Sequence, residues 1–127
     1  IEKGIQKPIL RVGNLDSVRT FLDVRDAVKA YWLLVNKCKP GEVYNIGGKA
    51  TMTIKKMLDK LISYSNYRNE IKIIVDPDLV RPADVTLQIP DYSKFQKKTG
   101  WEPRIEFDQT LQDTLSYWRE YVQNQIK

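Results

Sequence analysis

Residues 18–37 read VRTFLDVRDAVKAYWLLVNK, and this stretch decides the fold class. Residues 18–22 are rich in β-branched and aromatic side chains, which predicts a strand. Asp23 is a good helix N-cap, and Asp26 adds a carboxylate to the first turn of the helix predicted over residues 24–37. The predicted core face of that helix consists of Ala27, Tyr31, Leu34 and Val35. A strand running directly into an amphipathic helix indicates an α/β protein.

Short strands and helices alternate along the rest of the chain. Apolar and β-branched runs predict strands over residues 8–12, 42–46 and 71–75. Three further helices are expected after the N-caps Thr53, Asp91 and Asp108. The predicted apolar stripes are Ile54, Met57, Leu58, Leu61 and Ile62 in the first of them, and Leu111, Leu115, Trp118 and Val122 in the last. So few and such short strands make a poor sheet alone, so we expect one domain of a longer polypeptide over residues 1–127.

The tryptophans and the glycine pair have structural interpretations. Trp32, Trp101 and Trp118 lie in or beside helices and are predicted to be core residues. Gly47-Gly48 predicts a loop with unusual backbone angles. A phosphate-binding loop is the alternative, but Lys49 is followed by Ala50 rather than by Ser or Thr.

Composition excludes several classes of function. The 127 residues contain one cysteine and no histidine, which rules out an internal disulfide framework, a Ser-His-Asp triad and a histidine proton shuttle. The net charge of +5 favours anionic ligands. We expect a cytoplasmic protein with no membrane segment, because no apolar run is long enough to span a bilayer and no signal-peptide pattern is present.

Arg19 and Arg81 are the candidate ligand-binding residues, because each sits beside a conformational constraint. Arg19 lies in an extended segment after a glycine turn, and Arg81 lies in a loop restricted by Pro82. The guanidinium group matches phosphate oxygens, and two facing groups would clamp a pyrophosphate. The alternative is that both are ordinary solvated surface residues, and Asn45 could equally be a strand-end residue that bonds its own backbone.

Four stretches of the chain carry a family resemblance: GNLDSVRTFLDVRDAVKAYWLL (13–34), GEVYNIGG (41–48), DPDLVRPADVTLQIPDYSKFQKKTGWEP (76–103) and FDQTLQDTLSYWRE (107–120). Together they resemble the C-terminal half of the nucleotide-sugar epimerases and dehydratases of the extended short-chain dehydrogenase/reductase family. Within that family the GDP-mannose 4,6-dehydratases are the most similar, followed by the GDP-4-keto-6-deoxymannose reductases.

The resemblance implies a set of substrate-binding positions. Arg19 and Arg81 match phosphate-binding arginines, with Asp84 beside Arg81, and Asn45 matches the asparagine of the YNIGG motif. Leu10, Arg11 and Val12 match a segment that packs on the nucleotide base and ribose. The family usually has Asp directly after the first arginine, and Thr20 stands there in this chain. That difference removes a carboxylate expected to orient Arg19.

The resemblance also implies the chemistry of the complete enzyme. A GDP-mannose 4,6-dehydratase oxidises C4 of the hexose with NADP, removes water across C5 and C6, and returns the hydride to C6. The cofactor glycines, the catalytic Tyr and Lys and the acidic base lie in the family's N-terminal dinucleotide-binding half, and none of them is present here. We therefore expect this chain to bind a nucleotide sugar such as GDP-mannose, to bind no NADP and to be inactive alone. We also expect it to join an N-terminal Rossmann half in a homo-oligomer.

A small basic interaction module, for example one that binds nucleic acid, is the alternative from another class. Such a module would combine clustered basic residues with exposed aromatic residues. The lysines of this chain are scattered, and its aromatic residues occupy predicted core positions. We therefore expect no nucleic-acid partner.

Overall fold

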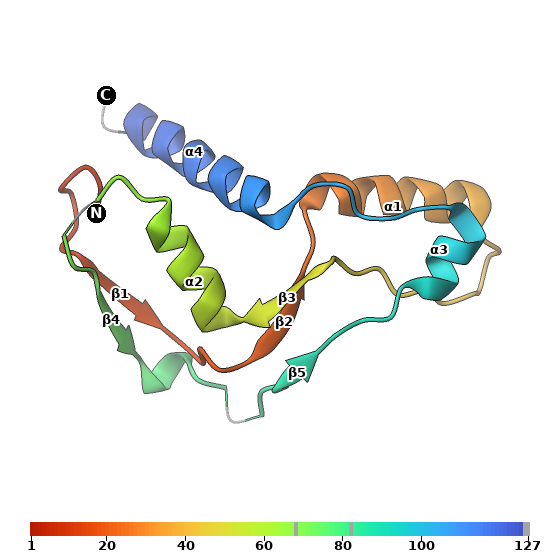
Figure 1. Cartoon of the computed structure of the whole chain (residues 1–127), viewed down its shortest axis with the longest axis horizontal. Coiled ribbons are helices and arrows are strands. Elements are labelled where there is room, and N and C mark those ends of the chain that lie inside the picture. Colours follow the sequence, from red (N-terminus) through yellow and green to blue (C-terminus); the bar gives the residue numbers. More distant parts are fainter. Residues whose placement is uncertain (68, 82, 126–127) are drawn as a thin grey trace.

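The computed structural model of the chain describes residues 1–67, 69–81 and 83–125 and shows a mixed α/β fold (Figure 1). Pro82, the proline of the predicted constraint on Arg81, lies outside the described residues. The elements in chain order are β1 (Ile9–Val12), β2 (Val18–Phe21), α1 (Val24–Lys37), β3 (Ala50–Thr53), α2 (Ile54–Ser63), β4 (Lys72–Val75), the 3-10 turn η1 (Pro77–Leu79), β5 (Leu87–Gln88), α3 (Ser93–Thr99) and α4 (Phe107–Gln125).

The strands form two small sheets. β1 pairs in parallel with β4, and β2 lies between antiparallel β3 and parallel β5. β1 and β2 are joined by residues 13–17, so the two sheets meet where the first strand ends and the second begins (Figure 1). The mixed α/β class predicted from the sequence is confirmed.

The helix caps explain why the helices begin where they do. Asp23 accepts a hydrogen bond from the Arg25 amide at 2.8 Å, and Thr53 accepts one from the Lys56 amide at 3.1 Å. Both N-caps were predicted. Asp91 was also predicted as an N-cap, but α3 begins at Ser93 rather than at Tyr92, so that Tyr92 occupies the N-cap position. Asp91 accepts a hydrogen bond from the Ser93 amide at 2.8 Å.

The core lies where α3 and the chain after it pack against α1. Ala30 and Phe95 are fully buried, and Trp101 is 5% exposed. The Phe95 and Trp101 rings lie 5.5 Å apart, and the indole of Trp101 donates to the Asp26 carbonyl at 3.2 Å. Partly buried residues around them are Leu22, Leu33, Leu34, Cys38, Tyr44, Ile46 and Tyr92.

Asp26, in the first turn of α1, also holds a distant segment of the chain. Its side chain is 1% exposed and accepts hydrogen bonds from the amides of Arg104 and Ile105, both at 2.8 Å. These bonds keep the pKa of Asp26 below its ordinary value despite its burial, which acts in the opposite direction. Asp26 therefore ties α1 to the segment that leads into α4.

α2 and α4 pack beside each other at the other end of the molecule (Figure 1). The predicted stripes of both helices face inward, but most of their residues are only half-buried. An open apolar groove of about 550 Å³ lies there, lined among others by Leu10, Leu58, Leu61, Leu115, Trp118 and Val122. No helix among the described residues is long and apolar enough to cross a membrane.

Several expectations about burial are wrong. Trp101 is core, but Trp32 and Trp118 are 70% and 53% exposed. On α1, Tyr31 and Val35 are 60% and 80% exposed instead of buried, because the helix carries apolar residues on two sides and only one side meets the rest of this chain.

The strand predicted over residues 42–46 is also absent. This segment carries no ladder pairing in the described part of the chain, and residues 50–53 form β3 instead, paired with β2. Gly47 and Gly48 lie in a loop, as predicted, but the positive φ angles among the described glycines occur at Gly4, Gly41 and Gly100. A Cβ at Gly48 would lie 1.6 Å from the Phe21 carbonyl oxygen, so close backbone packing requires glycine there.

Candidate functional site

The loop that carries Arg81 is brought to β2 by pairing with β5. In the parallel register, Val18 lies opposite Leu87 and Arg19 lies opposite Gln88. The Val18 amide also donates to the Thr86 carbonyl at 2.8 Å. Leu79 lies against Gly13, directly after β1, and Thr86 lies against the first residue of β2.

Arg19, Arg81 and Asp84 line one pocket of about 240 Å³, together with Asn14, Ser17, Ile54 and Leu79. We call this the arginine pocket. Glycine at position 13 permits its closed shape, since a Cβ there would lie 2.6 Å from the Leu79 carbonyl oxygen. Two arginines and one aspartate leave the pocket with a net positive charge, which suits an anion.

Asp84 accepts hydrogen bonds from three other residues of the arginine pocket. One of its carboxylate oxygens accepts from the Ser17 hydroxyl at 2.5 Å and from the Asn14 side-chain amide at 2.9 Å. The other accepts from the Arg19 guanidinium at 2.9 Å. The Ser17 hydroxyl foremost, then Asn14 and the charge of Arg19, keep the pKa of Asp84 below its ordinary value. The carboxylate therefore stays ionised and holds Arg19 in place.

Arg19 keeps donors for a ligand. Its side chain is 22% exposed, and it donates to the Val18 carbonyl at 2.9 Å and to Asp84. Within the described part of the chain these contacts use two of its five N–H groups, which leaves three for a further acceptor. Thr20, where the family has Asp, instead bonds the Thr51 hydroxyl at 2.8 Å across the β2–β3 pair. Asp84 supplies the orientation that the missing carboxylate was expected to give.

Arg81 is exposed at the mouth of the arginine pocket. No ion pair holds its guanidinium among residues 1–67, 69–81 and 83–125. The two arginines thus differ: Arg19 is fixed by its neighbours, and Arg81 is available from an irregular loop. An anion in the pocket would meet both.

The other predicted positions are not brought into the arginine pocket. Leu10 lines the apolar groove between α2 and α4, and Val12 is half-buried in β1. Arg11 projects to solvent and reaches Asp76 at 3.4 Å. Asn45 is exposed in the unpaired segment after α1.

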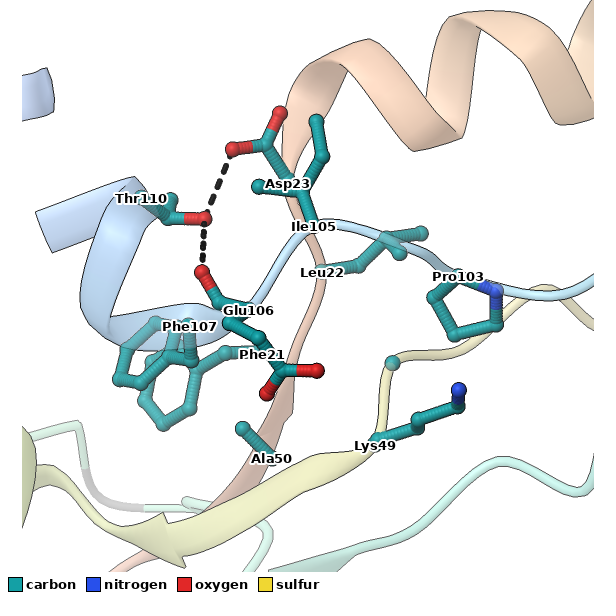
Figure 2. Close-up of a pocket in the computed structure, with 11 residues that line it drawn as sticks. Phe21, Leu22, Asp23, Lys49, Ala50, Pro103, Ile105, Glu106, Phe107 and Thr110 are labelled. Atoms are coloured by element: carbon teal, nitrogen blue, oxygen red, sulfur yellow. Dashed lines mark hydrogen bonds between the residues drawn. The ribbon is translucent and has the colours of Figure 1, made fainter.

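A second hollow, of about 130 Å³, lies between the end of β2 and the start of α4 (Figure 2). The Thr110 hydroxyl reaches Asp23 at 2.7 Å and the Glu106 carbonyl at 3.4 Å. Asp23 also accepts twice from the Arg25 guanidinium, and chiefly this holds its pKa far below the ordinary value. Because Arg25 and Thr110 already occupy the Asp23 carboxylate, we interpret this hollow as a structural contact between α1 and α4.

Asn14 and Ser17 are site residues that sequence reasoning missed. Ser17 is 2% exposed, and its burial is explained by its bond to Asp84, which lies far along the chain. The available signal was their place in the sequence: Asn14 follows Gly13, and Ser17 directly precedes the strand that carries Arg19.

Comparison with known proteins gives the chain a family. GDP-6-deoxy-D-mannose reductase from Pseudomonas aeruginosa is 30% identical over 125 residues, covering 98% of this chain and 40% of that protein. Human dTDP-D-glucose 4,6-dehydratase is 32% identical over 109 residues, covering 84% of this chain and 31% of that protein. The chain thus spans about two fifths or less of these relatives.

Solved structures agree with the sequence relatives. The structure of RMD from Pseudomonas aeruginosa complexed with NADPH matches with a TM-score of 0.83 and 30% identity, covering 94% of this chain and 39% of that one. UDP-glucose 4-epimerase from Thermotoga maritima, solved with UDP-glucose, matches with a TM-score of 0.74 and 30% identity, covering 90% and 35%. The family described as GDP-mannose 4,6 dehydratase matches residues 1–114. On this evidence the chain belongs to the GDP-mannose 4,6-dehydratase family, among the nucleotide-sugar epimerases and dehydratases of the extended short-chain dehydrogenase/reductase fold.

Proposed function

We propose that this chain is the C-terminal, nucleotide-sugar-binding part of a GDP-mannose 4,6-dehydratase, and that its arginine pocket holds the phosphates of the substrate. The observation that carries the proposal is the convergence of Arg19 and Arg81 on one pocket, with Arg19 oriented by Asp84. A guanidinium held by Asp84 and an exposed one without an ion pair among the described residues suit the two ends of a pyrophosphate.

The proposed division of labour separates binding from redox chemistry. The chain has no glycine-rich dinucleotide fingerprint and no Tyr followed four residues later by Lys. NADP, held by the N-terminal half, would supply the reversible hydride transfer that the dehydration of the hexose requires. The residues of this chain would hold the non-reacting phosphates, which keeps the sugar in register with the other half.

A GDP-4-keto-6-deoxymannose reductase is the second candidate. It is favoured by the likeness to GDP-6-deoxy-D-mannose reductase along nearly the whole chain. Both candidates would use the same phosphate pocket. They differ in the sugar that the complete enzyme accepts and in the reaction, which is either loss of water without net use of NADPH or reduction of a 4-keto group by NADPH.

Titration calorimetry and product analysis test the proposal. This chain alone should bind no NADP and turn over no GDP-mannose. The complete enzyme should bind GDP-mannose and release a product lighter by one water, without net consumption of NADPH. Consumption of NADPH with the 4-keto sugar, and no reaction with GDP-mannose, would establish the reductase instead. Stoichiometric NADP binding by this chain alone would contradict the division of labour.

A further inference from the structure

Ser17 is the most deeply buried residue that lines the arginine pocket. It is 2% exposed and directly precedes β2. Its hydroxyl donates to one oxygen of the Asp84 carboxylate, Oδ2, at 2.5 Å. A side chain buried to this degree presents almost no surface to a ligand. Any effect of Ser17 on ligand binding must therefore pass through another residue.

Asn14 sets the direction of the Ser17 hydrogen bond. The Asn14 side-chain oxygen accepts from the Asp16 amide at 2.9 Å, which leaves its NH₂ group for the arginine pocket. That group donates to the Ser17 Oγ and to Asp84 Oδ2, both at 2.9 Å. The Ser17 oxygen is thus an acceptor for Asn14, and its single proton goes to Asp84. Two donors on Oδ2 fix the rotation of the Asp84 carboxylate.

The pairing of Arg19 with Asp84 differs from that of Arg25 with Asp23. Arg25 holds Asp23 by two contacts, from Nε at 2.9 Å and from Nη2 at 2.8 Å, one to each carboxylate oxygen. Such two-pronged pairs are frequent between arginine and carboxylate groups. Arg19 instead reaches Asp84 through one contact, from Nη2 to Oδ1 at 2.9 Å. The other oxygen, Oδ2, is engaged by the Ser17 hydroxyl.

The single contact preserves the donors that a phosphate requires. A two-pronged pair with Asp84 would use one more N–H group of Arg19 and would turn its fork of donors toward the carboxylate. We infer that Ser17 is a positioning residue for Arg19: its hydroxyl holds Asp84 in the single-contact arrangement and so keeps the guanidinium open to a phosphate. The inference rests on the proposed function in taking a phosphate as the ligand of the arginine pocket.

The alternative role of Ser17 is a purely structural one. Its bond to Asp84 ties the residues before β2 to the loop before β5, and loss of the hydroxyl would then disturb the whole arginine pocket. The two roles differ in how they depend on Arg19. A positioning residue acts through Arg19, so its effect on binding disappears when Arg19 is absent. A structural residue affects binding whether or not Arg19 is present.

A double-mutant cycle in the complete enzyme tests the inference. The dissociation constant of GDP-mannose is measured by titration calorimetry for the parent enzyme, Ser17→Ala, Arg19→Ala and the double variant. Ser17→Ala should weaken binding by about 5-fold or more, but by less than about 2-fold in the Arg19→Ala background. Ser65→Ala is the matched control, because Ser65 donates to Glu2 at 2.7 Å, beside Arg119, and lines the apolar groove instead. This variant should leave binding unchanged.

Ser17→Cys separates the hydrogen bond from side-chain size, because a thiol is similar in size but is a weak donor. It should weaken binding as Ser17→Ala does, and urea unfolding reports whether each variant is folded. Unchanged binding in Ser17→Ala beside weakened binding in Arg19→Ala overturns the inference and leaves the phosphate site standing. The inference is also overturned by an equal loss in both backgrounds, by parent-like binding in Ser17→Cys, or by failure of both Ser17 variants to fold. Unchanged binding in Arg19→Ala would refute the proposed phosphate site and the inference with it.

Discussion

Replacing Gly48 with alanine should destabilise the chain strongly, because two backbone segments meet at this residue. A Cβ at position 48 would lie 1.6 Å from the Phe21 carbonyl oxygen and 3.2 Å from the Leu22 Cα. Real Cβ contacts essentially never fall below 3.0 Å, so β2 and the loop at Gly47 and Gly48, which we call the glycine loop, would have to separate by more than an ångström. Overpacking costs about 1–3 kcal/mol where neighbouring side chains can adjust. The atoms that meet here belong to the backbone and cannot adjust in this way, so we expect the free energy of unfolding to fall by about 3 kcal/mol or more.

Gly41→Ala is the matched control for this experiment. Gly41 has a φ of +84° and no atom within 4 Å of its would-be Cβ, so alanine there costs only the left-handed backbone conformation, about 1–2 kcal/mol. Urea unfolding followed by far-UV circular dichroism gives both free energies. A Gly48→Ala variant no less stable than Gly41→Ala would show that β2 and the glycine loop are not in close contact in solution.

Two further predictions concern burial and pH. Trp101→Ala should lower the free energy of unfolding by about 3–5 kcal/mol, and Trp118→Ala by clearly less, because Trp101 is 5% exposed and Trp118 is 53% exposed; equal losses in urea melts would contradict the assigned core. The pKa of Glu2 is lowered from 4.5 to about 2, chiefly by hydrogen bonds from Arg119 at 2.7 and 2.8 Å. A lowered folded-state pKa adds stability that is present above about pH 4.5 and lost as the pH falls toward about 2, amounting to about 1–3 kcal/mol. Glu2→Gln should remove that part of the acid dependence, and an unchanged pH profile would refute it.

Local signals in the sequence predicted the elements whose causes are local. The strand over residues 18–22, the helix after Asp23 and the Thr53 cap depend on neighbouring residues, and all three are present in the structure. The strand predicted over residues 42–46 failed because strand formation requires a partner, and the described chain offers none there.

The periodicity of α1 could not say which apolar side is covered by this chain. Tyr31 and Val35 satisfy the helical spacing of a core stripe, yet the side occupied by Ala30 faces the core. Apolar spacing identifies a surface that must be buried, but it does not identify what buries it.

Of the residues that line the arginine pocket, the sequence singled out Arg19, Arg81 and Asp84, but it did not indicate how they come together. Arg19 and Arg81 were chosen from backbone constraints and from the family resemblance, and their shared pocket depends on the pairing of β2 with the two-residue strand β5. So short a strand leaves almost no pattern in sequence. The role of Asp84 as the group that holds Arg19, together with Asn14 and Ser17, required the folded geometry.

The most direct measurement of the central claim is the dissociation constant of GDP-mannose for the complete enzyme carrying Arg19→Ala or Arg81→Ala. Each variant should weaken binding by about 1.5–3 kcal/mol, the range for hydrogen bonds to charged groups, and the double variant by less than the sum, because both groups share one ligand. Lysine should restore binding only in part, since it lacks the forked donors of arginine. Lys55→Ala, on the exposed side of α2, should leave binding unchanged. An unchanged dissociation constant at low salt in either arginine variant would contradict the assignment of that arginine to the phosphate site.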